Sequence, residues 1–424
     1  MRATAIAFLA AVAAFAAALA APQERAESRY FEAESALLAG DVEGAMAAFT
    51  ALIDDYPPAR FPALTWRAAA AVRAGELELE LGRADAGEAR FVAVLDGEPP
   101  SVWSSRARLG LARSLMWRGE WPAATELLQS IVDAVEAGTD DADPIGAGLA
   151  REYLGLAHRL WVRPAAGEAP WRQSGRLAVG AELDNPIGVA AATGVGVLVV
   201  DEGTDVVTLI DPAGPPVSAT VRDAARPWWG TAGEALVAAD QSVNAPFGLE
   251  SHQFALPQGD RRRPLNDLRA GARSATGDWI LLDAGFKQVM VFSSGGDYLR
   301  SLDLGPGGEP VDVALGPLGK VFVIEKRRRE VRVFNPDGSL FTGFGYDRWR
   351  EPYALAVDAV GFVYLLDRGN RQIEIFDPEL GAGWTLGPVL PGGLELRDPR
   401  DIAVDGSGRV LIADRGLSAI IVIE

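Results

Sequence analysis

The sequence of 424 residues contains no cysteine and only two histidines, His158 and His252. The missing thiols exclude disulfide bonds, thiolate metal sites and a lipid-modified N-terminal cysteine. Two histidines in segments of different character are too few for a zinc cage. A Gly-x-Ser-x-Gly motif and a phosphate-cradling Gly-Lys-Ser loop are also absent. The composition therefore points away from zinc enzymes, serine hydrolases and P-loop NTPases, and no cofactor is expected.

Positive charge is also scarce, because the formal net charge is −18 at pH 7. Such a field repels polyanions, so nucleic acid is not expected as a partner. The one long apolar run, Ala3–Ala20 after Arg2, predicts a secretory signal peptide over residues 1–20, cleaved after Ala20. An uncleaved membrane anchor remains the alternative. No later run is long enough to span a membrane, which predicts an exported bacterial protein, periplasmic or secreted.

What the sequence does contain is a repeat. The segment Glu351–Asp377 has three short apolar runs separated by Gly, Asp and Asn turns, which predicts a β-meander. Similar units open at Pro186, Asp267, Pro310 and Pro399, and a weaker one has Ala235–Asp240 as its second strand. A four-stranded unit that recurs at roughly 40 to 50 residues is typical of a β-propeller. We expect six blades.

These units resemble the NHL-repeat family of six-bladed propellers. The match rests on Ala356-Val357-Asp358, Gly361, Asp367, Gly369-Asn370-Arg371 and Phe376, and again on Ala403-Val404-Asp405 and Asp414. It covers residues 176–424 and weakens toward the second blade. The resemblance implies a fold rather than a chemistry.

The preceding segment, 27–162, changes to helical periodicity with Gly40, Gly82 and Gly119 at repeating positions. It resembles tetratricopeptide repeats, which predicts three helical pairs and a capping helix. Glu34, Glu76 and Glu80 fall on the expected inner helices and disfavour a clamp for a peptide carboxylate. Residues 163–175 have the composition of a linker. The fold class is thus an α-solenoid followed by an all-β propeller.

The last blade has only three apolar runs before Glu424. We therefore expect the segment Arg176–Leu183 to supply its missing outer strand and to close the ring.

Two sets of acidic residues invite functional hypotheses. The second strands end in Asp201, Asp240, Asp283, Glu325, Asp367 and Asp414, which we interpret as caps of their own turns. The inner strands begin with Asp267, Glu309, Asp312, Glu351, Asp398 and Asp401. The second set could converge on the central channel as ligands for Ca²⁺, as in propeller lactonases, although residues before proline also form simple turns.

Basic residues gather in two runs against the acidic background. Arg261–Arg263 falls in the link between blades two and three, and Lys326–Arg329 falls in a turn of blade four. With Arg368 and Arg415, they predict a basic propeller face, although solvated loop arginines are the simpler interpretation.

We therefore expect a non-catalytic envelope protein that binds or scaffolds protein partners, with an acidic protein or an anionic glycan as the partner. A propeller hydrolase or lactonase with a Ca²⁺-type channel metal is the alternative. Whether the propeller face or the solenoid is the main binding surface stays open.

Overall fold

The computed structural model describes residues 22–424 except 63, 181, 193–194, 212, 231–233, 249–250 and 259–260. The expected signal peptide, 1–20, lies outside the described residues. The chain divides into two compact units. One holds most of the helices, as far as Ala150. The other holds residues Arg151–Glu424 together with the short segments Glu80–Gly82 and Leu115–Thr125.

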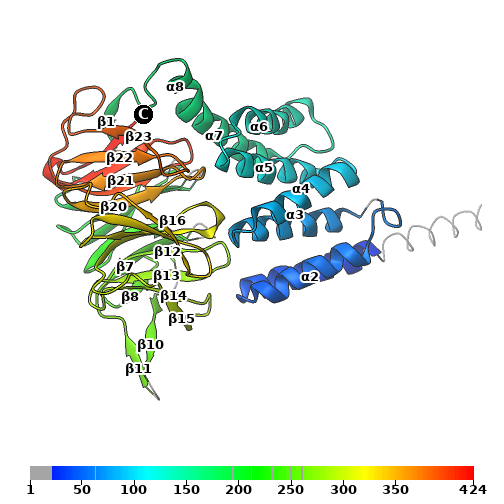
Figure 1. Ribbon diagram of the computed structural model, residues 1–424, viewed down its shortest axis with the longest axis horizontal. Helices are drawn as coiled ribbons and strands as arrows, with labels where there is room; N and C mark the ends of the chain where they lie inside the picture. The colour runs from blue at the N-terminus through cyan, green and yellow to red at the C-terminus, as the bar shows by residue number, and fades with distance from the viewer. Residues whose placement is uncertain are drawn as a thin grey trace, which may run out of the picture. The chain divides into compact units, whose positions relative to one another are not determined.

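The helical part is a succession of antiparallel helices (Figure 1). A first helix covers residues 22–38. The following helices are α2 (Val42–Asp55), α3 (Thr65–Glu80), α4 (Ala84–Gly97), α5 (Val102–Trp117), α6 (Trp121–Ala137), α7 (Pro144–Ala157), a π-helical turn (His158–Val162) and α8 (Arg163–Ala165).

Glycines end alternate helices where the chain must reverse. Gly40, Gly82 and Gly119 have φ values of 83°, 76° and 73°, a left-handed conformation that costs glycine little. Phe49 and Phe91 are fully buried between the helices. The expected helical pairs are therefore present. Of the acidic residues that disfavoured a carboxylate clamp, Glu34 and Glu76 share the single guanidinium of Arg73, which compensates only part of their charge.

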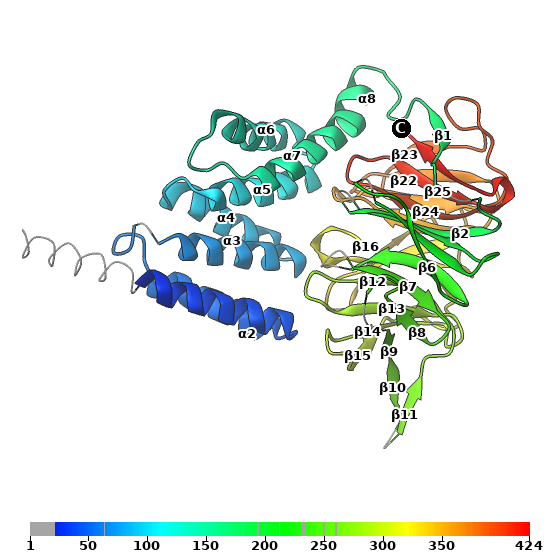
Figure 2. The ribbon, with the colours of Figure 1, turned by 180° about the vertical axis from the view of Figure 1, so that it is seen from behind.

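The second unit is a six-bladed β-propeller, as the repeat predicted. Among the described residues, six four-stranded sheets form the blades (Figures 1 and 2). Blade one is β2 (Pro186–Ala192), β3 (Gly196–Asp201), β4 (Val206–Ile210) and β5 (Val217–Thr220), and blade two is β6 (Ala224–Trp229), β7 (Ala235–Ala239), β8 (Ser242–Asn244) and β9 (His252–Gln253). Blade three is β12 (Leu268–Arg273), β13 (Trp279–Asp283), β14 (Gln288–Phe292) and β15 (Tyr298–Ser301), and blade four is β16 (Pro310–Leu315), β17 (Val321–Glu325), β18 (Glu330–Phe334) and β19 (Leu340–Phe344). Blade five is β20 (Pro352–Val357), β21 (Val363–Asp367), β22 (Gln372–Phe376) and β23 (Ala382–Leu386), and blade six holds β24 (Pro399–Val404), β25 (Val410–Asp414) and β26 (Ala419–Ile423).

An N-terminal strand completes blade six. Strand β1 (Ser174–Arg176) pairs antiparallel with β26, with Ser174 opposite Ile423. The closing strand was expected and is confirmed, but its position was wrong: it ends at Arg176 instead of beginning there. Its sequence, Ser-Gly-Arg, has no strand propensity of its own, so its pairing with β26 defines it.

The segment expected to be a linker, 163–175, is partly structured. Helix α8 extends to Ala165, and Trp171 is only 2% exposed. The indole of Trp171 donates a hydrogen bond to the carbonyl of Gly408 at 2.9 Å and packs edge-on against Tyr364 and Trp384. The end of this segment is therefore anchored to blades five and six.

The inner strands form a closed ring, because each lies beside the next and β24 lies beside β2. Each inner strand has a β-bulge near its first residues, for example between Pro310 and Asp312 and between Pro399 and Asp401. Blade two has the same irregularity between Ala224 and Pro227. Bulges redirect side chains, and here they fall at the level where charged side chains reach the channel.

A two-stranded hairpin, β10 (Ala255–Gln258) and β11 (Arg261–Pro264), links blades two and three. It projects from the edge of the propeller in both views (Figures 1 and 2). Over the part of the chain that the structure describes, no helix is both long and apolar enough to cross a membrane.

Candidate functional site

The carboxylates at the ends of the second strands brace the turn face, which we define as the turns between second and third strands and the links between blades. In blade five, both oxygens of Asp367 accept backbone N–H groups, from Arg350 at 3.0 Å and Glu351 at 2.8 Å. Asp201, Asp283, Glu325 and Asp414 accept equivalent bonds from the residues before their own inner strands. Their interpretation as turn caps is supported.

Three buried charges from alternate blades meet in the central channel. Arg226 of blade two forms a close ion pair with Asp312 of blade four, and its Nε lies 3.6 Å from Oδ1 of Asp401 in blade six. These side chains are 12%, 5% and 5% exposed. Arg226 also donates to the carbonyl of Tyr353 at 2.6 Å. We call Arg226, Asp312 and Asp401 the channel triad.

The channel triad is electrostatically unbalanced, because it holds one guanidinium and two carboxylates. Burial raises the pKa of Asp401 to about 7, with Arg226 lowering it and Asp312 raising it. Burial also raises the pKa of Asp312, although the adjacent Arg226 and the backbone N–H of Leu355 oppose the shift. Burial therefore raises the pKa of both carboxylates of the triad, and that of Asp401 reaches about 7.

Of the six acidic residues considered as calcium ligands, only Asp312 and Asp401 line the channel. The other four lie on the turn face beside cations. Asp267 pairs with Arg269, Glu309 with Lys287 and Lys326, Glu351 with Arg368, and Asp398 with Arg368, Arg400 and Arg415. Within the described residues, no three His, Asp or Glu side chains gather as a metal-binding group.

An arginine cluster surrounds Asp398 at the channel end of the turn face. Arg368, Arg400 and Arg415 donate to its carboxylate at 3.1, 2.9 and 2.6 Å. Partial burial opposes ionisation, but these donors hold the pKa of Asp398 below its ordinary value. The guanidiniums of Arg226 and Arg368 each lie 5.2 Å from the ring centre of Tyr353, which therefore separates the channel triad from the cluster.

The basic run of blade four is in the β17–β18 turn, as expected. Lys326 lies 3.8 Å from Glu309, Arg327 donates to the carbonyl of Gly307, and Arg329 pairs with Asp347. Arg328 pairs with Glu330 at 3.6 Å.

The other basic run is on the projecting hairpin. Arg262 lies 3.5 Å from Asp297, and Arg263 lies 4.2 Å above the ring of Phe286. The structure therefore brings Arg368 and Arg415 together around one carboxylate, but it places Arg261–Arg263 on a separate element.

Several cations of the turn face occupy backbone positions that do not favour them. Lys287, Arg329 and Arg371, each directly before or next to a third strand, have φ values of 57°, 50° and 55°. Left-handed backbone costs a long side chain energy that glycine does not lose. Asp205 and Ser418 hold the same position in blades one and six, with φ values of 55° and 47°, so the left-handed residue is a feature of the repeated turn.

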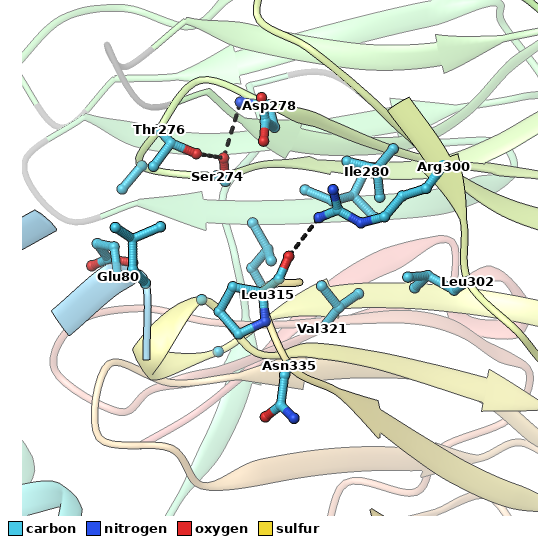
Figure 3. Close-up of a pocket in the computed structure, with 16 residues that line it drawn as sticks. Glu80, Ser274, Thr276, Asp278, Ile280, Arg300, Leu302, Leu315, Val321 and Asn335 are labelled. Atoms are coloured by element: carbon cyan, nitrogen blue, oxygen red, sulfur yellow. Dashed lines mark hydrogen bonds between the residues drawn. The ribbon is translucent and has the colours of Figure 1, made fainter. Parts of the chain in front are cut away.

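A hollow of about 100 Å³ lies beside the β12–β13 turn. In Figure 3 the hydroxyl of Ser274 bonds to Thr276 and to the backbone N–H of Asp278, while Arg300 lies across the hollow. Arg300 donates to the carbonyl of Pro336. These polar groups therefore serve the propeller's own turns.

The two histidines lie in the same compact unit, on a helical turn before the propeller and on β9 of blade two. His158 begins the π-helical turn, and the ring of His252 lies 4.8 Å from that of Trp279.

Sequence reasoning missed Arg226, Tyr353 and Arg400. Arg226 stands in the weakest repeat, where the register of the inner strand was not assigned. Aligning Ala224–Trp229 with the strands of Asp312 and Asp401 is the signal that identifies it.

No family model matches the chain, and no curated protein matches it. Solved structures similar to it include streptogramin B lyase, with a TM-score of 0.45 and 12% identity over 59% of this chain and 97% of that one. An auxiliary nutrient binding protein from Bacteroides thetaiotaomicron has a TM-score of 0.46 and 13% identity over 57% and 69%. A gluconolactonase from Xanthomonas campestris has a TM-score of 0.44 and 14% identity over 57% and 86%.

Proposed function

We propose that this chain is a non-catalytic binding protein of the bacterial envelope, and that the turn face of its propeller binds an acidic protein partner. The observation that carries the proposal is the sharing of carboxylates. Three arginines share Asp398, and two lysines share Glu309. Because Arg368 also pairs with Glu351, three arginines meet two carboxylates in one group and two lysines meet one carboxylate in the other. Each group thus has one positive charge in excess, although the whole chain is strongly acidic.

The exposure of these cations supports the same function. Lys287, Lys326 and Arg415 are 61%, 55% and 41% exposed, so carboxylates of a partner can reach them. Lys287, Arg329 and Arg371 also hold strained left-handed positions.

The channel triad favours binding over metal-dependent catalysis. The guanidinium of Arg226 occupies the space between Asp312 and Asp401, which are the two carboxylates best placed to hold a channel metal. Ca²⁺ takes six to eight oxygen ligands, and with this guanidinium between them the two carboxylates cannot both bind one ion. The alternative function, a propeller hydrolase or lactonase with a Ca²⁺-type metal, requires Arg226 to move away.

Export to the periplasm is part of the proposal and rests on the sequence of residues 1–20. An anionic envelope glycan is the other partner with suitable chemistry. An acidic protein and an anionic glycan both carry carboxylates or similar anions, to which arginine and lysine bind well.

The test compares a turn-face variant, Lys326→Ser with Arg327→Ser and Arg415→Ser, with a charge-matched control. In the turn-face variant Glu309 keeps Lys287, and Asp398 keeps Arg368 and Arg400. The control replaces three exposed arginines elsewhere, Arg25, Arg60 and Arg176, with serine.

The probe is poly-L-glutamate, whose association with the full chain is followed by surface plasmon resonance over a range of salt concentrations. We expect slower association and a weaker salt dependence for the turn-face variant only, with unchanged melting curves. Equal association rates for wild type and both variants at low salt contradict the proposal.

A further inference from the structure

The central channel holds a cavity of about 260 Å³ on the far side of the channel triad from the turn face. It runs along the inner strands from Arg226, Asp312 and Asp401 to Val357 and Val404. The inner strands present mostly small aliphatic side chains to it, including Ala190, Ala270, Ala272, Ala314, Ala356 and Ala403. Because these side chains are short, the channel stays hollow where larger ones would fill it.

The floor of this cavity is charged, and its walls combine apolar side chains with polar backbone groups of the inner strands. All three members of the channel triad line it, and their side chains are at most 12% exposed. The guanidinium of Arg226 is close to Asp312 but lies 3.6 Å from Asp401, beyond ordinary hydrogen-bonding distance. Asp401 is therefore a buried carboxylate with incomplete charge compensation that faces an open volume.

A buried carboxylate of this kind favours a cationic group at hydrogen-bonding distance. An anion is disfavoured because two carboxylates outnumber one guanidinium. A neutral apolar molecule fits the walls but leaves the carboxylate of Asp401 without a counter-charge. A cation with an apolar body satisfies both parts of the cavity.

We propose that this cavity binds a small organic ammonium ion, with the charged head against Asp401 and the apolar body between the alanine walls. The site is separate from the proposed acidic-partner surface, because the channel triad and Tyr353 lie between them. The two proposals can therefore fail independently.

Proton binding competes with the ammonium ion at Asp401. The groups that face this carboxylate are Arg226 from β6, Asp312 from β16, and the backbone N–H groups of Val189 from β2 and Ile402 beside it. Burial raises the pKa of Asp401 to about 7, so its ionised fraction rises through neutral pH. Binding of the cation should strengthen over the same range.

The experiment titrates pentylammonium chloride into the full chain by isothermal calorimetry. Sodium chloride at equal ionic strength and pentanol are the comparison ligands. We expect saturable binding of pentylammonium, roughly tenfold weaker at about pH 6 than at about pH 8 because protonation of Asp401 competes. Equally strong binding of pentanol, or of sodium, overturns the proposal.

Two variants and one control test the location. Asp401→Asn removes the charge at nearly constant shape, and we expect binding weaker by at least about tenfold. Ala356→Leu fills the cavity from its wall while leaving the floor intact, and we expect binding to be lost. Asp303→Asn, at an exposed aspartate of a blade link, should bind as the wild type does.

Melting curves establish that each variant is folded. Ala356→Leu decides the question even if Asp401→Asn is unstable, because it leaves the triad unchanged. Undiminished binding by Ala356→Leu, or no binding of pentylammonium by the wild type, contradicts the proposal.

Discussion

Asp312 reaches beyond its own blade, because its Oδ2 accepts a hydrogen bond from the backbone N–H of Leu355, on the inner strand of the next blade, at 2.8 Å. Asp401 does the same from blade six to blade one, where the N–H of Val189 donates to it at 2.9 Å. These carboxylates therefore join the inner strands of neighbouring blades, in addition to forming the channel triad with Arg226.

Arg226 and Asp312 form an ion pair, so their contributions to the free energy of unfolding should be strongly coupled. Asp312→Ala leaves a buried guanidinium and the N–H of Leu355 without their acceptor, and we expect a loss of about 3 to 5 kcal/mol. The double variant Arg226→Met with Asp312→Ala should lose clearly less than the sum of the losses of Arg226→Met and Asp312→Ala measured separately. Urea unfolding measures the cycle, with Glu379→Ala as an exposed control expected within about 0.5 kcal/mol of wild type. Additive losses contradict the coupling.

The protonation of Asp401 should make the stability of the propeller depend on pH. Its pKa is about 7 in the folded chain and 3.8 as the ordinary value, so the folded state binds the proton more tightly. The stability gained from this proton is complete below about pH 4 and is lost as the pH rises through about 7.

Asp401→Asn should remove that contribution. The difference in free energy of unfolding between wild type and variant should therefore change in favour of the variant as the pH rises from about 4 to about 7. Urea unfolding at a series of pH values measures it. A difference that stays constant across this window shows that Asp401 is ionised throughout.

Closure of the ring should depend on Trp171. Trp171→Ala removes a fully buried indole from its contacts with Tyr364 and Trp384, and we expect a loss of about 3 to 5 kcal/mol. Trp171→Phe keeps most of the packing but loses the bond to Gly408, so its loss should be about 1 to 2 kcal/mol. Arg172→Ala, at an exposed neighbour, is the control. If Trp171→Ala has the same urea midpoint of unfolding as the wild type, Trp171 does not have this role.

Lys287 should show a conflict between stability and binding. Because its φ is 57°, Lys287→Gly removes backbone strain and should stabilise the chain by roughly 1 kcal/mol. The same change removes a turn-face cation that is 61% exposed, so association with poly-L-glutamate should slow. Lys320→Gly, at a position with φ of −69°, is the matched control and should not be stabilised. A destabilised Lys287→Gly variant contradicts the argument from strain.

Calcium should leave the melting temperature unchanged, because Arg226 lies between the two channel carboxylates. A bound cation at about 100 times its Kd stabilises a protein by roughly 2.7 kcal/mol, which a thermal melt detects readily. Magnesium and a chelator provide the controls. A rise that the chelator reverses supports the hydrolase alternative and counts against the binding function.

The sequence was most informative where its repeat was strongest. Pro310, Pro352 and Pro399 each open an inner strand. Five of the six acidic residues expected at the ends of the second strands cap turns, whereas Asp240 follows the end of β7 and accepts the N–H of Leu268 through its backbone carbonyl. The hairpin β10–β11 was not predicted, because Arg-Arg-Arg-Pro has neither apolar alternation nor strand propensity. The closing strand was predicted at the wrong residues for a similar reason, because only its pairing with β26 makes Ser174–Arg176 a strand.

For the candidate site, the sequence identified Asp312 and Asp401 as channel residues but not the cation between them. Arg226 is an ordinary residue in a poorly matching repeat, and only the closed ring brings it next to carboxylates from two other blades. The shared bonds of Asp398 were equally hidden, because Arg368, Arg400 and Arg415 come from a turn, a strand and another turn. Long-range convergence of this kind depends on the register of every blade.

The pairing of β1 with β26 also has a consequence for the order of folding. The first strand of the propeller to be synthesised finds its partner only after the last strand of blade six exists. Contacts so distant in sequence form slowly, because a long loop must close before they contribute. Until then β1 presents an unpaired edge, which exposes a partly made chain to aggregation.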